Sequence, residues 1–282
     1  MSKLLALDLD GTLFYPHRFF RCVPKKNVKF LRKWIDAGNE VVLVSSRGPE
    51  TMEKIKEEID RDVDFISYTS SYIVAKGEVI KDEPVKNDLA ELVVAMIEKE
   101  HNPIAILGNF GGRPLAIKSV KGAGKILLGL YWLYWFFQGK KHEKYILNNK
   151  VFDEYLKHDN VYKVMVFFGF SKKGKNYAKN INKEIRETIP QIESSWAGPT
   201  IEVTPQNCSK GKGLEYYCEH LGINKKDVYV VGDSGNDINM FKLFNENSYV
   251  MKHAYPSVKK HAKHVISRVY KLDKILLNKE GD

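Results

Sequence analysis

Cysteine is scarce in this chain, and no apolar run is long enough to cross a membrane. The 282 residues include three cysteines, Cys22, Cys208 and Cys218, which form no CxxC pair and no metal-ligand spacing. So few cysteines, in an odd number, argue against a disulfide framework and favour a reducing compartment. The apolar stretch near the N-terminus breaks at Asp8, which argues against a signal peptide. We therefore expect a cytoplasmic protein.

The longest apolar stretch covers residues 126–137 and is flanked by lysines. A membrane-spanning helix needs about 20 apolar residues, so we expect no membrane span. Four interpretations of the stretch stay open. It could be a buried helix, an interface in a homo-oligomer, a contact with a membrane surface, or the lining of a substrate pocket.

A nucleic-acid motif is also lacking, although the formal net charge is +10. The basic residues are dispersed, with short clusters such as Lys140-Lys141 and residues 172–175. A nucleic-acid-binding protein would combine such charge with a recognisable motif or a continuous basic face. We therefore expect no nucleic-acid partner, and a basic surface also suits an anionic small molecule.

What the chain does contain begins at residues 4–13, an apolar strand that ends in Asp8-Leu9-Asp10-Gly11-Thr12-Leu13. Side chains two residues apart in a strand point the same way, so Asp8 and Asp10 are predicted to share one face at the strand's end. Gly11 permits a turn that exposes backbone N–H groups. Two carboxylates beside such a turn predict a site for a divalent cation and a phosphate, and one carboxylate could act as a nucleophile.

Two further strands are predicted to end in polar residues. Residues 39–44 form an apolar, β-branched run that is followed by Ser45-Ser46-Arg47. A second run stops at Asp233 and continues through a glycine-containing loop to Asn236 and Asp237. Acids placed one directly after a strand and one four residues later can hold magnesium directly and through water. The lysine Lys210, at a predicted helix start, would add positive charge where backbone N–H groups already attract anions.

Together these segments resemble the four motifs of the haloacid dehalogenase (HAD) superfamily, in the same order along the chain. D-x-D-G-T-L is matched at residues 8–13, a hydroxyl motif at 45–49, S-K-G at 209–211 and G-D-x-x-N-D at 232–237. The similarity is strongest to its Cof-type class II sugar-phosphate phosphatases. It implies an α/β fold: a Rossmann-like core with a parallel sheet at residues 1–83 and 206–282, and an inserted α+β type-B cap at 84–205.

The resemblance also implies roles for particular residues. Asp8 would be the nucleophile that forms an aspartyl-phosphate, and Asp10 the general acid and base. Mg²⁺ would be held by Asp8, the Asp10 backbone carbonyl and Asp233. The phosphate would be bound by Gly11, Ser45, Ser46, Asn236 and Lys210, with Asp237 and Arg47 in support. Whether Ser45 or Ser46 faces the phosphate stays open.

The sequence therefore predicts a Mg²⁺-dependent phosphatase for a small phosphate ester, with sugar phosphates leading and phosphorylated cofactors and nucleotides behind. Two alternatives stay open. A phosphomutase of the same superfamily would return the phosphoryl group to a sugar, and an idle binding protein would keep the fold without turnover. A homo-oligomer formed through the cap is a further expectation.

Local patterns predict the elements that carry these motifs. Residues 24–37 and 49–59 have the apolar spacing of helices, and residues 64–68 that of a short strand. The inserted segment is predicted to contain both strands and helices, with a strong strand at 161–168 and a hairpin at 192–203. A helix at 211–221 returns the chain to the core.

Overall fold

The structure is a computed structural model that describes residues 2–16, 22–120, 129, 145–169, 171–197 and 200–277. The chain divides into two compact units. The core unit combines Met1–Asp82 with Ser209–Asp282, and the inserted unit is Glu83–Cys208. This division, with the two sheets described below, confirms the predicted α/β core with an inserted α+β unit. The predicted apolar stretch at 126–137 lies outside the described residues, apart from Gly129.

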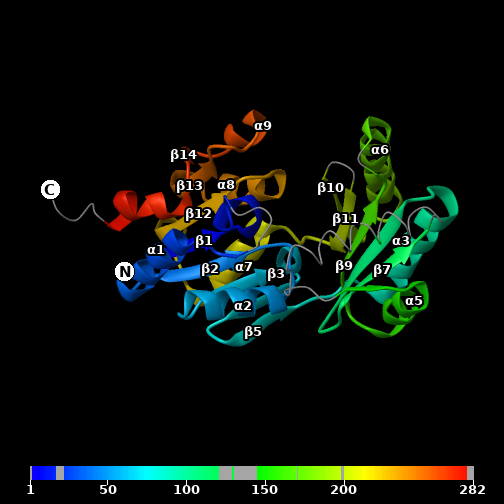
Figure 1. Cartoon of the computed structure of the whole chain (residues 1–282), viewed down its shortest axis with the longest axis horizontal. Helices are drawn as coiled ribbons and strands as arrows, with labels where there is room; N and C mark the ends of the chain where they lie inside the picture. Colours follow the sequence, from blue (N-terminus) through cyan, green and yellow to red (C-terminus); the bar gives the residue numbers. More distant parts are fainter. Residues whose placement is uncertain are drawn as a thin grey trace. The chain divides into compact units, whose positions relative to one another are not determined.

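The core unit is built on one eight-stranded sheet with the strand order β14-β13-β12-β1-β2-β3-β4-β5. Strand β1 pairs in parallel with both β12 and β2, so segments from the two ends of the chain lie side by side (Figure 1). The sheet is parallel from β14 to β3, and β4 and β5 are antiparallel. The strands are β1 Leu4–Leu7, β2 Glu40–Val44, β3 Asp64–Ser67, β4 Tyr72–Ala75, β5 Glu78–Asp82, β12 Val228–Gly232, β13 Ser248–Met251 and β14 His264–Ile266.

Helices cover both faces of this sheet. They are α1 Lys25–Asp36, α2 Pro49–Ile59, α7 Lys210–Leu221, α8 Ile238–Leu243 and α9 Pro256–Lys259. Leu5 and Leu7 pack into one apolar core with α1 and α2, whereas Leu4 and Ala6 pack into another with α7 and α8. Because successive side chains of a strand point to opposite faces, a strand covered on both sides is apolar throughout. This explains the continuous apolar run that precedes Asp8.

The boundaries of α2 show how the local sequence sets an element near the site. Pro49 occupies its first turn, where a missing N–H costs nothing because no intrahelical partner exists there. The helix ends at Asp60, which adopts a left-handed conformation with φ of 56°. The structure places α2 at the predicted residues 49–59.

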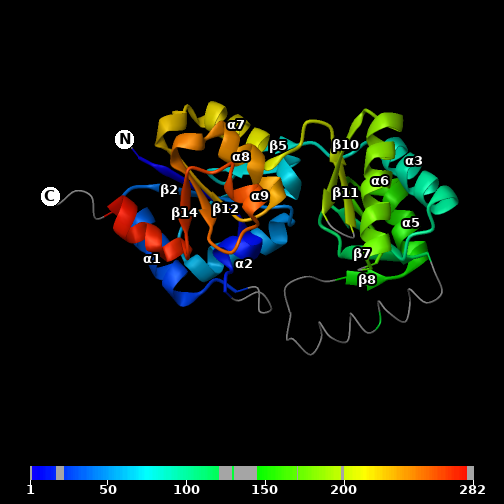
Figure 2. The same ribbon diagram turned by 90° about the horizontal axis from the view of Figure 1, so that it is seen from above.

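The inserted unit contains a six-stranded sheet with the order β10-β11-β9-β6-β7-β8. Its strands are antiparallel except for the parallel pair β7 and β8. Three helices pack against this sheet and share one apolar core with it (Figure 2). The elements are α3 Asn87–Glu100, β6 Ala105–Phe110, β7 Leu115–Ser119, β8 Tyr145–Leu147, α5 Asn149–His158, β9 Val161–Phe167, α6 Lys172–Thr188, β10 Ile192–Ala197 and β11 Thr200–Pro205.

No helix in the described part of the chain is long and apolar enough to cross a membrane.

Candidate active site

The candidate site lies where three neighbouring parallel strands end. Asp8 follows β1, Ser45 follows β2 and Asp233 follows β12. The sheet order places β1 between the other two strands, so their carboxyl ends meet at one edge. The Asp8 N–H still donates to the Val231 carbonyl at 3.0 Å, which fixes the backbone of Asp8 against β12. Ligand sites of open α/β sheets form at this edge.

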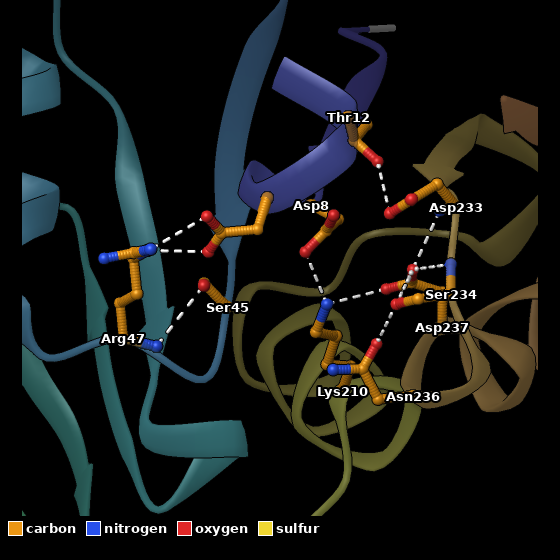
Figure 3. A network of polar contacts seen from close by, with 10 residues as sticks. Asp8, Thr12, Ser45, Arg47, Lys210, Asp233, Ser234, Asn236 and Asp237 are labelled. Carbon is orange, nitrogen blue, oxygen red and sulfur yellow. Dashed lines mark hydrogen bonds and ion pairs between the residues drawn. The ribbon is translucent and has the colours of Figure 1, made fainter. Parts of the chain in front are cut away.

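Lys210 connects the acids of the site (Figure 3). It is the first residue of α7, and its side chain is 1% exposed. Its ammonium Nζ lies 2.5 Å from Asp8 Oδ1 and 2.7 Å from Asp237 Oδ1. The lysine assigned from motif order alone is therefore in contact with both carboxylates.

Asp237 is fixed from its other oxygen. Asp237 Oδ2 accepts hydrogen bonds from the backbone N–H groups of Asp233 and Ser234, both at 2.9 Å. The Ser234 hydroxyl lies 3.2 Å from the same oxygen. With Oδ2 bound to the loop, Oδ1 is left to face Lys210. Asp237 thus positions both the lysine and the loop that carries Asp233.

Asp233 packs against the turn that follows β1. Gly11 has φ of +85°, and a Cβ atom there would lie 2.3 Å from Asp233 Oδ2, so both the turn and this close approach require glycine. The Thr12 hydroxyl lies 3.5 Å from Asp233 Oδ1. On the other oxygen, His253 Nε2 lies 3.3 Å from Asp233 Oδ2.

Burial and crowding shape the charges of these groups. Burial raises the pKa of Asp8 well above its ordinary value, Lys210 opposes the shift, and Asp237 and Asp233 add to it. Burial also raises the pKa of Asp233, with a further contribution from Asp237. For Lys210, burial lowers the pKa but is outweighed by Asp237 and Asp8, so the net shift is upward. The lysine stays charged among acids whose ionised forms repel one another.

Asp10 departs from the prediction that it shares a strand face with Asp8. Strand β1 ends at Leu7, and the chain then turns through Leu9–Leu13. The Asp8 side chain is 5% exposed and that of Asp10 is 52% exposed. Arg47 donates Nε–H to Asp10 Oδ2 at 2.6 Å and Nη2–H to Asp10 Oδ1 at 2.8 Å. The expectation was wrong because the strand stops before the two acids.

The remaining predicted residues lie around this centre. Ser45 is buried, and its hydroxyl accepts the Arg47 backbone N–H at 3.3 Å. Ser46 follows it and is half-buried. Asn236 is exposed, and its side-chain carbonyl accepts the Ser234 hydroxyl at 2.7 Å. Asn236 therefore joins the network through Ser234.

Two contacts to Asp233 were not predicted from the sequence. Thr12 belongs to the first motif but was given no role, and His253 lies outside all four motifs. A usable signal did exist, because His253 follows shortly after β13, another parallel strand of the same sheet. Polar residues just beyond such strands are candidates for the site.

A divalent cation fits the carboxylates of this site. Asp8, Asp233 and Asp237 each offer an oxygen, and the three oxygens lie within 4.8 Å of one another. Asp8 Oδ2 is buried and has no hydrogen-bond partner. Three carboxylates against the single Lys210 ammonium leave an excess of negative charge that a hard cation with oxygen ligands would balance. The residues present therefore suit a hard divalent cation.

The chain is similar to known proteins over most of its length. A family model for haloacid dehalogenase-like hydrolases matches residues 5–275. The curated 5-amino-6-(5-phospho-D-ribitylamino)uracil phosphatase YbjI of Escherichia coli is 23% identical over 271 residues, which cover 93% of this chain and 89% of that protein.

Two solved structures have the same fold. One is a haloacid dehalogenase-like hydrolase from Bacteroides thetaiotaomicron, with a TM-score of 0.77 and 21% identity, covering 98% of this chain and 100% of that one. The other is described as the HAD subclass IIB sugar phosphatase BT4131, with a TM-score of 0.72 and 20% identity. The match covers 97% of this chain and 98% of that one. At these identities the likeness concerns the fold.

Proposed function

The chain belongs to the haloacid dehalogenase-like hydrolase family, and on that premise we propose that it is a Mg²⁺-dependent phosphatase working through an aspartyl-phosphate. Hydrolysis of a phosphoric monoester is supported by the family and by relatives that are named as phosphatases. The observation that carries the proposed aspartyl-phosphate mechanism is the surroundings of the Asp8 carboxylate. One oxygen is bound to a buried lysine, and the other is buried without a hydrogen-bond partner.

Asp8 is the proposed nucleophile. An oxygen of its carboxylate attacks phosphorus, the P–O bond to the alcohol breaks, and the alcohol takes a proton from Asp10. Water then attacks the phosphorus of the aspartyl-phosphate and gives its proton to Asp10, which releases inorganic phosphate and regenerates Asp8. Lys210 holds Asp8 in place and offsets charge on the transferring group.

Asp10 has to change partners in this scheme. Arg47 now donates two N–H bonds to its carboxylate. A general acid must carry a proton, so Asp10 has to leave at least one of these bonds before the first step. Arg47 would thereby set where Asp10 rests between turnovers.

The proposed Mg²⁺ ligands are Asp8, Asp233 and the Asp10 backbone carbonyl. Asp237 supports them through Lys210 and the Asp233 backbone N–H. When bound, the cation would supply positive charge beside the phosphoryl group. Ser45, Ser46, Asn236 and the N–H groups of the turn at Gly11 are the proposed phosphate ligands. Asp237 keeps its supporting role by holding Lys210.

A sugar phosphate is the proposed substrate. YbjI is named for a phosphate ester on a ribityl chain, and BT4131 is described as a sugar phosphatase. We also predict that the inserted unit, with boundaries near residues 84 and 205, selects the substrate by contacting its leaving group. Homo-oligomers through that unit, a cytoplasmic location and the lack of a nucleic-acid partner stay predictions as well.

The test is a panel of phosphate esters incubated with Mg²⁺, read as released inorganic phosphate. Sugar monophosphates are expected to be hydrolysed with many turnovers. Phosphoryl transfer between sugars without phosphate release would favour the phosphomutase. No turnover on any ester, with intact metal binding, would favour an idle binding protein.

Removal of the metal should greatly slow the enzyme. With a chelator in excess, the rate on an aryl phosphate is expected to fall on the order of 10²–10³-fold, because a bound cation supplies several kcal/mol of transition-state stabilisation. Added Mg²⁺ should restore the rate. An unchanged rate in excess chelator would contradict the metal assignment.

Substitution Asp10→Asn should slow turnover while binding persists. We expect kcat to fall on the order of 10²–10³-fold, as for a lost general acid–base, with little change in the inhibition constant of inorganic phosphate. Asp10 is largely exposed, so the variant should fold normally. The control is Asp36→Asn, which removes an exposed acid that Arg61 also binds through two N–H bonds. A wild-type rate in Asp10→Asn would assign the proton transfer to another group.

A further inference from the structure

Both oxygens of Asp233 have a side-chain neighbour outside the motif that contains it. Oδ1 faces the Thr12 hydroxyl at 3.5 Å, and Oδ2 faces His253 Nε2 at 3.3 Å. The His253 and Asp233 side chains are 18% and 16% exposed, so the contact is shielded from bulk water. In the His253 tautomer that carries its proton on Nε2, this nitrogen donates a hydrogen bond to the Asp233 carboxylate.

The imidazole of His253 is itself held in place. Its ring stacks on Tyr15 with centroids 4.1 Å apart and an interplanar angle of 27°. The Arg268 guanidinium carbon lies 4.3 Å from the centroid of the same Tyr15 ring. Tyr15 follows the turn after β1, and Arg268 follows β14. Tyr15, which is itself covered by Arg268, thus holds the His253 ring beside Asp233.

We propose that His253 is a positioning residue, which holds the Asp233 carboxylate in the orientation that binds the divalent cation. The proposal rests on the proposed function, because it assigns Asp233 to the metal. Its own basis is the Nε2–Oδ2 contact and the ring stack behind it. Groups that hydrogen-bond a metal-binding carboxylate typically change metal affinity or activity by about 10–100-fold when they are removed.

The test separates the hydrogen bond from the packing. His253→Phe keeps an aromatic ring for Tyr15 but has no N–H for Asp233. His253→Gln provides an amide N–H at a similar reach but no ring. The matched control is His264→Phe, because His264 also stacks on a tyrosine, Tyr249, at 4.8 Å and 26°.

The measurement is the Mg²⁺ dissociation constant, the concentration obtained by fitting the rise of Tm with added Mg²⁺ in the absence of substrate. We expect this concentration to increase about 10-fold or more in His253→Phe, to return toward the wild-type value in His253→Gln, and to stay unchanged in His264→Phe. The Mg²⁺ concentration for half-maximal phosphatase rate should shift in the same order.

Different results would overturn the proposed function and the role of His253. A wild-type chain whose Tm does not respond to Mg²⁺ would overturn the metal assignment of the proposed function, and the inference with it. A wild-type response that His253→Phe leaves unchanged would overturn the inference alone. Tighter Mg²⁺ binding by His253→Phe would also overturn the inference. It would mean that the wild-type imidazole competes with the cation for Asp233.

Discussion

Replacing Asp8 by Asn should abolish turnover and leave no covalent intermediate. The expected loss in kcat is on the order of 10⁴-fold or more, the scale seen when a nucleophile that acts with its neighbours as a unit is removed. An amide oxygen is a poor nucleophile toward phosphorus, and Lys210 would have a neutral partner in place of a charged one. The measurements are phosphate release and the label retained on acid-quenched protein after incubation with a radiolabelled ester.

The same substitution should stabilise the chain when no metal is present. Asp8 is buried, its pKa is raised by that burial, and one of its oxygens has no hydrogen-bond partner. Its ionised form is therefore costly in the metal-free fold, and Asn removes the charge at nearly constant volume. Mg²⁺ should raise the Tm of Asp8→Asn by less than it raises the Tm of the wild type.

Asp64→Asn is the matched control for a buried core aspartate. Asp64 accepts the Tyr217 hydroxyl at 2.6 Å and the Lys76 N–H at 2.9 Å, so its oxygens are used. This variant is expected to lose stability and keep its turnover, the reverse of Asp8→Asn. An Asp8→Asn variant that retains a substantial rate and a labelled intermediate would place the nucleophile elsewhere.

The sequence predicted the acids of the site because strand ends are local features. The apolar run before Asp8 and the β-branched run before Asp233 are both required by a sheet covered on two sides. Proximity of Lys210 to Asp8 is a different matter, since the two residues are separated by 202 positions. That contact depends on α7 packing against the sheet that contains β1, and only the order of the motifs in a known family implied it.

The expectation for Asp10 was wrong because it assumed that the strand continues through Asp8 to Asp10. The alternation of side chains holds inside a strand, and β1 ends at Leu7. The partner that determines the environment of Asp10 is Arg47, in another loop. His253 was missed because β13 itself was not predicted, so its position just beyond a parallel strand was not recognised.

In the inserted unit, the helix α5 at Asn149–His158 was not predicted, although its signals are present. The Asn148 side chain accepts the N–H groups of Lys150 and Val151 and thereby caps the helix. The buried residues Phe152 and Leu156 are spaced by four, as one helix face requires. The pattern is short and rich in charged residues, so its apolar face becomes evident only against β6 and β7.

Replacing Lys210 by Met should damage both catalysis and stability. The ammonium is the charged group that touches both Asp8 and Asp237. Met fills similar space without charge, which leaves two buried carboxylates facing each other. Breaking a buried ion pair by removing one partner costs about 3–5 kcal/mol, so the free energy of unfolding should fall by that amount without metal. We expect kcat to fall on the order of 10⁴-fold, because the nucleophile loses its anchor and the phosphoryl group loses a cation.

Lys118→Met supplies the comparison, since Lys118 also lies between two acids. Its Nζ is 2.8 Å from Glu98 and 2.7 Å from Asp153, but those acids are 31% and 46% exposed. Solvent screens such pairs, so this variant should lose about 1 kcal/mol and keep its activity on an aryl phosphate.

The change in Tm on adding Mg²⁺ tests whether Lys210 balances the charge of the acids or only fills space between them. If the lysine balances the acids, saturating Mg²⁺ should raise the Tm of Lys210→Met by more than it raises that of the wild type, because the cation then meets uncompensated carboxylates. This response is opposite in sign to the one expected for Asp8→Asn. Equal Mg²⁺ responses in the wild type, Asp8→Asn and Lys210→Met would contradict a shared electrostatic centre, since a cation bound there must sense each change in the charge around it.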